Sequence, residues 1–175
     1  KVAAFGALLR LFYVAFGSDR WSWQPMLWVI AILTMVVGAV LAIAQSDVKR
    51  MLAYSSIENM GLLFVGIGLA LVFFGYGMKP MAALALTATL YHVASHAFFK
   101  SLLFLGTGSV LHATQERNLG KLGGLMRYMP WVAWTMLVAV IASAGLPPSN
   151  GFVSEWLLLQ GFLFTGGLPN PYLRM

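Results

Sequence analysis

The chain has 175 residues, of which 60% are hydrophobic and 9% are charged, and its formal net charge is +6. Because a soluble domain has about 25% charged residues, this composition excludes an ordinary water-exposed surface and predicts a protein embedded in lipid. The basic residues do not cluster as a binding patch, which argues against nucleic acid as a partner, and the absence of cysteine excludes disulfides, thiolate sites and iron–sulfur ligation in this segment.

Five hydrophobic segments predict an all-α transmembrane helix bundle. The first runs from Lys1 to about Gly17, and because no signal-peptide pattern precedes its apolar run, we expect an internal fragment entered partway along a helix. The second, from about Gln24 to Gln45, is long enough to cross a hydrocarbon core of roughly 30 Å. A charged turn at 47–50 is predicted to close it, before a third segment at about 52–75.

The fourth segment, from Met81 to about His112, is unusually long. As unbroken helix it would measure about 48 Å at 1.5 Å per residue, so it must tilt, kink or project beyond the hydrocarbon. A polar stretch at 113–130 separates it from the fifth segment, which runs from Trp131 to about Thr165 and is followed by a predicted loop.

The fifth segment is interrupted at residues 145–151. Pro147 and Pro148 remove two backbone donors, and a flanking glycine such as Gly151 tolerates unusual dihedral angles, so a broken helix is predicted. Alternating crossings then divide the basic residues between two sides, and the richer side is predicted to be cytoplasmic. That side carries Lys49, Arg50, Arg117, Lys121 and Arg127, and the other carries Arg20, Lys79 and Arg174.

Three titratable residues in the fourth segment are four positions apart: His92, His96 and Lys100. Each step of four turns about 400°, so the three side chains form one slightly drifting row, roughly 6 Å apart along the axis. Such a row, joined by water, is typical of a proton relay, because ionisable groups inside a membrane are costly and usually functional. Two alternatives remain: hydrogen bonds to neighbouring helices with Lys100 at an interface, and a zinc site, although Val93 replaces the glutamate of the HExxH signature.

Two glutamates interrupt apolar segments. Glu155 lies just after the predicted break, where exposed backbone groups line a cavity or are buried in protein, and we interpret it as a transport residue. Its alternative is to cap the resumed half-helix, where a negative charge suits the dipole. Glu58 lies near one end of the third segment and is an accessory candidate. Lys1, taken alone, is interpreted as an end-of-helix anchor.

Four ordered motifs resemble those of one membrane protein family. The family comprises the antiporter-like subunits of respiratory complex I, the Mrp-type sodium/proton antiporters and the membrane-bound nickel–iron hydrogenases. The motifs are Asp47 to Ser56; His92 to Leu105; Leu122 to Leu125 with Met129-Pro130; and Leu146-Pro147-Pro148 with Gly151-Phe152. Residues 58–61 and 150–156 look nearest to the branch of hydrogenase-4 component B and formate hydrogenlyase subunit 3.

The resemblance implies that residues 1–175 form part of one proton-conducting domain, similar to helices eight to twelve of about fourteen. By residue matching, the proton relay would comprise Lys1, His92, His96, Lys100 and Glu155, with the first half-channel lying upstream. It also implies a multi-pass subunit of the prokaryotic inner (plasma) membrane that binds other membrane subunits and peripheral redox subunits. The subunit would be non-catalytic, would hold no cofactor or metal in this segment, and would move protons, or sodium in the Mrp-type alternative. A structural membrane anchor is the other alternative.

Overall fold

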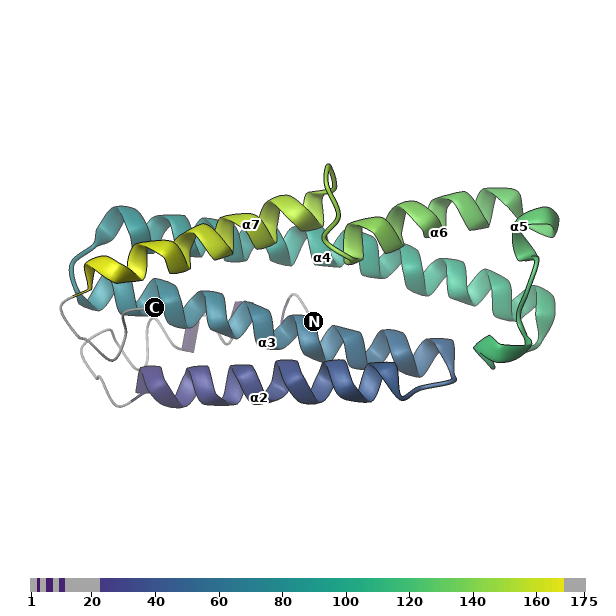
Figure 1. Ribbon diagram of the computed structural model, residues 1–175, viewed down its shortest axis with the longest axis horizontal. Coiled ribbons are helices and arrows are strands. Elements are labelled where there is room, and N and C mark those ends of the chain that lie inside the picture. Colours follow the sequence, from purple (N-terminus) through teal and green to yellow (C-terminus); the bar gives the residue numbers. More distant parts are fainter. Residues whose placement is uncertain (1–2, 4–5, 8–9, 12–22, 169–175) are drawn as a thin grey trace.

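The computed structural model describes residues 3, 6–7, 10–11 and 23–168 (Figure 1). Within them the chain is all-α, as predicted: no strand forms, although one isolated β-bridge pairs Asp47 with Asn118. The predicted first segment lies mostly outside this part of the chain, as do Lys1, Arg20 and Arg174. The helices are α2 (Trp23–Ile43), α3 (Val48–Gly75), α4 (Lys79–Thr114), α5 (Leu125–Tyr128), α6 (Pro130–Ser143) and α7 (Asn150–Leu163), with 3₁₀ turns η2 (Leu119–Lys121) and η3 (Phe164–Gly167).

Helix α3 lies in the middle of the bundle. It packs against α2 on one side and α4 on the other, and α6 and α7 follow one another along α4 (Figure 1). The helices α2, α3 and α4 are long and apolar enough to cross a membrane, and α6 is a shorter apolar helix. Helix α2 exposes many large apolar side chains, as expected of a surface that faces lipid or neighbouring membrane helices.

Helix α3 begins earlier than the sequence predicted. Residues 48–50, interpreted as part of a turn that closes the second segment, form its first turn instead. The reason is a helix N-cap: the Asp47 carboxylate accepts hydrogen bonds from the backbone N–H groups of Lys49 at 2.8 Å and Arg50 at 3.2 Å. These two bonds satisfy donors that have no partner inside the helix.

Helix α4 is also longer than predicted, and it is unbroken over 36 residues. It begins at Lys79 because Pro80 falls in the first turn, where its missing N–H costs nothing. It ends where Gln115 takes a left-handed backbone conformation, with φ of 55°. A helix of this length measures about 54 Å at 1.5 Å per residue, so it extends beyond an untilted hydrocarbon core.

The predicted break in the fifth segment is confirmed: α6 ends at Ser143 and α7 begins at Asn150. Ser149 caps α7, since its side chain accepts from Phe152 N at 3.3 Å. Gly151 differs from its predicted role, because it lies inside α7, and Gly145 is the glycine of the break that takes a positive φ, of 61°. Beyond α7, residues 164–167 form a 3₁₀ turn, where the predicted loop was expected to begin at 166.

The predicted grouping of the basic residues is confirmed for residues 49, 50, 79, 117 and 121. The segment before α3 meets the segment after α4, because Val48 N donates to Arg117 O at 3.4 Å and Leu119 N donates to Ser46 O at 3.0 Å. The basic residues at 49, 50, 117 and 121 therefore lie at one end of the bundle. Lys79, at the start of α4, lies at the opposite end.

Candidate functional site

The three titratable residues of α4 are all buried inside the bundle. His92 is 0% exposed, His96 4% and Lys100 5%. The rings of His92 and His96 are stacked, with centroids 6.3 Å apart, and Phe99 meets the edge of His96 at 5.3 Å. The spacing of four residues thus produces the row that the sequence predicted, and it faces protein rather than lipid.

His92 is held between α3 and α7. Its Nδ1 lies 2.8 Å from Ser154 Oγ on α7, and its Nε2 lies 3.1 Å from Asn59 Oδ1 on α3. The Ser154 hydroxyl donates to Gly151 O at 2.7 Å, and the Asn59 amide nitrogen donates to Ser55 O at 2.8 Å. With these donors engaged, both ring nitrogens of His92 face acceptors, an arrangement that accommodates a proton on each.

This geometry also allows His92 to release one of those protons. If the Ser154 hydroxyl rotates away from Gly151 O and donates to Nδ1, the neutral ring keeps a partner on each nitrogen. A change that requires one hydroxyl rotation and no movement of a helix suits a group that takes and gives protons repeatedly.

Lys100, the last residue of the row, also contacts α3. Its Nζ donates a hydrogen bond to Ser55 Oγ, from a site where the side chain is almost wholly buried. Ser55 and Asn59 are one helical turn apart on α3, so a single face of that helix contacts both ends of the row. The residues Ser55, Asn59 and Ser154 were not assigned a role from the sequence.

The two glutamates meet at a small cavity beside the helix break. The cavity measures about 110 Å³ and is lined by Met35, Ser55, Glu58, Asn59, Leu62, Ser143 and Glu155. Glu155 and Glu58 are close enough for their charges to interact. The Glu155 carboxylate also lies against Gly145, where an added Cβ would stand 2.5 Å from Oε2. Ser149 caps α7, whose first turn contains no acidic residue, and Glu155 lines the cavity.

The structure brings most of the predicted relay residues into one region, and their role in proton transfer stays a prediction. His92, His96 and Lys100 share one face of α4, and Glu155 shares a cavity with Ser55, the partner of Lys100. Glu58, an accessory candidate in the sequence, lines the same cavity. Lys1 lies outside the described residues. Within the part of the chain that the structure describes, no three His, Asp or Glu side chains gather as metal ligands would.

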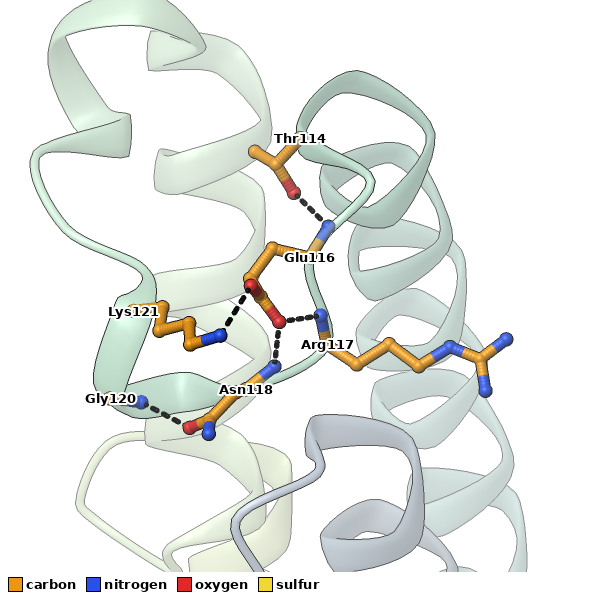
Figure 2. A network of polar contacts seen from close by, with 6 residues as sticks. All are labelled: Thr114, Glu116, Arg117, Asn118, Gly120 and Lys121. Atoms are coloured by element: carbon orange, nitrogen blue, oxygen red, sulfur yellow. Dashed lines mark hydrogen bonds and ion pairs between the residues drawn. The ribbon is translucent and has the colours of Figure 1, made fainter.

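A second polar network lies at the end of the bundle, after α4 (Figure 2). Glu116 Oε1 accepts from the backbone N–H groups of Arg117 at 2.9 Å and Asn118 at 3.0 Å, and its Oε2 lies 3.5 Å from Lys121 Nζ. The N–H groups of Asn118 and Arg117, followed by the Lys121 charge, lower the pKa of Glu116 below its usual value. Arg117 points its guanidinium away from this network (Figure 2).

Acid is expected to loosen this loop. Because the folded pKa of Glu116 is lowered, its stabilising effect is complete above the ordinary value of 4.5 and is lost as the pH falls through the folded value. Hydrogen exchange at the Arg117 and Asn118 amides, corrected for its intrinsic pH dependence, should therefore speed up below about pH 4.5. In a Glu116→Gln variant that acid-induced change should disappear; if it persists, another group holds the loop.

Comparison with known proteins identifies relatives across the chain. Residues 1–168 match the family model described as NADH:quinone oxidoreductase/Mrp antiporter, transmembrane. The chain is 42% identical to NADH-quinone oxidoreductase subunit N of Nocardioides sp., over 97% of its own length and 32% of that relative. It is 38% identical to formate hydrogenlyase subunit 3 of Escherichia coli, over 93% of the chain and 26% of the relative.

Hydrogenase-4 component B of Escherichia coli is 35% identical, over 82% of the chain and 21% of the relative. The chain thus spans about a fifth to a third of the length of these relatives. The family model covers almost the whole chain, and α4, the helix that carries the buried histidines and lysine, is apolar enough to span a membrane. The predicted resemblance is confirmed: the chain belongs to the NADH:quinone oxidoreductase/Mrp antiporter family of transmembrane proteins.

Proposed function

We propose that this chain is the second half-channel of a proton-translocating, antiporter-like membrane subunit. The observation that carries the proposal is the buried row of His92, His96 and Lys100, linked through α3 to the cavity at Glu155. Protons would pass between α4 and the helix break by way of these groups and water in the cavity. A buried basic residue inside a membrane helix costs free energy, and such residues therefore usually have a function.

The whole protein would belong to a hydrogenase or NADH:quinone oxidoreductase type of complex in the prokaryotic inner membrane. The relatives named above are subunits of such enzymes by their names, which supports this placement. In that setting the chain would contact other membrane subunits, while peripheral subunits carry the electrons. The segment itself would hold no redox cofactor and would catalyse no electron transfer. Lys1 would be the next proton carrier.

The test is ion movement by the full-length protein in its complex. In inside-out membrane vesicles, the electron donor of the complex should drive acidification of the interior, measured with a pH-sensitive dye. The signal should collapse with a protonophore and should be unchanged when sodium is replaced by choline. Electron transfer without any ion movement would make the subunit a structural anchor, and proton movement that requires sodium would make it an Mrp-type antiporter.

A further inference from the structure

Glu58 is the one ionisable residue at the cavity that the proposed relay does not use. It lies on α3, three residues from Ser55, so the two side chains point to the same side of that helix. Ser55 accepts the hydrogen bond of Lys100 Nζ. The same cavity is lined by Glu155 on α7. Glu58 therefore shares one cavity with Ser55, the partner of the last basic group of the row, and with the acid at the helix break.

The cavity is suited to water. A site needs polar partners and about 10–15 Å³ of accessible volume to hold one water molecule, and this cavity measures about 110 Å³. Its wall presents two carboxylates, two hydroxyls and an amide, from Glu58, Glu155, Ser55, Ser143 and Asn59. Several water molecules could therefore bridge these groups, and a chain of hydrogen bonds would connect Lys100 with both carboxylates.

The pair of carboxylates also favours the binding of one proton. Two negative groups that share one small cavity repel each other, and a proton bound between them removes that repulsion. Lys100 can supply such a proton through Ser55 and the cavity water. The proton balance is simple: Lys100 loses one proton, Glu58 gains it and passes it to Glu155, and Glu155 later releases it.

We propose that Glu58 is a proton carrier in series with Lys100 and Glu155, so that the two carboxylates form one station which holds a single proton at the helix break. This inference rests on the proposed function and adds a residue to it. It implies that a proton leaving Lys100 crosses first to α3 and only then to α7. Helix α3 is thus part of the path and not merely a support for α4.

The test compares variants of the full-length protein in its complex, measured as protons moved per electron pair in inside-out vesicles. Glu58→Gln keeps the shape of the side chain but cannot carry a proton, and we expect it to lower the ratio roughly 100-fold, as loss of a positioned acid or base does. Glu58→Asp keeps the carboxylate and should retain at least half of the wild-type ratio. Glu116→Gln, which removes a carboxylate from the loop after α4, is the matched control and should leave the ratio unchanged.

The double variant Glu58→Gln/Glu155→Gln distinguishes a path in series from two parallel paths. In series, the double variant should lower the ratio no further than the more affected single variant, whereas two parallel paths predict that each single variant keeps the other path and only the double variant loses both. A double variant far below both single variants, a wild-type ratio in Glu58→Gln, or an equal loss in the Asp and Gln variants would each overturn the inference. If Lys100→Met stops proton movement while Glu58→Gln does not, the proposed function stands and this inference fails.

A second measurement uses the wild-type protein and does not depend on any variant folding. Dicyclohexylcarbodiimide reacts with protonated carboxyl groups in apolar surroundings, and mass spectrometry locates its adduct. A proton shared by the pair predicts an adduct on Glu58 or on Glu155 of a given molecule, with a matching loss of proton movement. Adducts confined to Glu155 would show that Glu58 does not carry the proton.

Discussion

Replacing Lys100 by Met is expected to lower proton movement by roughly 100-fold, the range that follows loss of a positioned acid or base. Met preserves most of the length and volume of the side chain, so α4 should still pack against α3. It removes the Nζ that donates to Ser55 Oγ, and with it the contact of Lys100 with a residue that lines the cavity. The measurement is proton movement in vesicles, with the electron-transfer rate and the amount of assembled complex recorded in parallel.

Two further variants separate proton transfer from simple packing. Lys100→Arg keeps the positive charge but cannot release a proton near neutral pH, so it should be nearly as slow as Lys100→Met. Lys79→Met removes an exposed lysine from the other end of the same helix and should behave like the wild-type protein. If the arginine variant moves protons at the wild-type rate, Lys100 supplies charge or packing and does not act in the relay.

Much of this site follows from local periodicity, which a sequence displays directly. The positions of His92, His96 and Lys100 on one face of α4 depend only on 3.6 residues per turn. The helix break follows from two adjacent prolines, because the missing donors act within a few residues. The bundle class follows from the length and apolar character of the segments.

The partners of the row could not be predicted, because they come from residues far away in the chain. Lys100 contacts Ser55, 45 positions earlier, and His92 contacts Ser154, 62 positions later. Serine and asparagine in an apolar helix give no direction by themselves, since they also bond to their own helix, as Ser56 does to Leu52 O. The role of Glu155 could not be predicted for the same reason. Its position relative to the start of α7 can be counted in the sequence, but the cavity that it lines is formed partly by residues of other helices.

The early start of α3 has a signal in the sequence, Asp47, which fits either a charged turn or a helix N-cap. Asp47 followed by Val48, Lys49 and Arg50 was interpreted as a charged turn because three of the four residues carry charge. An aspartate just before a long apolar segment is also a typical N-cap, and this second property decided the structure. The role of Lys1 rests on the resemblance alone and stays a prediction.

Replacing Gly151 by Ala is expected to destabilise the full-length protein by about 1–3 kcal/mol, as overpacking of a tight contact does. Gly151 is buried in the first turn of α7, where an added Cβ would collide with the carbonyl oxygen of Ala142 near the end of α6. A backbone carbonyl cannot swing aside as a flexible side chain can, so one of the two half-helices must shift.

The matched control is Gly108→Ala, in the interior of α4, where an added Cβ would have no atom within 4 Å. There alanine should be neutral or should stabilise the helix by up to about 1 kcal/mol, because it costs less conformational entropy than glycine. The comparison is the midpoint of thermal unfolding in detergent. Equal midpoints for the two variants would show that α6 and α7 do not need this close contact.

Replacing Gly151 by Ala should also slow proton movement in the molecules that remain folded. Gly151 O accepts the hydrogen bond of Ser154, and Ser154 Oγ contacts His92 Nδ1. A shift of α7 therefore reaches the histidine row through one hydroxyl group, and the break becomes part of the relay geometry. A Gly151→Ala protein that is less stable but moves protons at the wild-type rate would mean that His92 does not depend on Ser154.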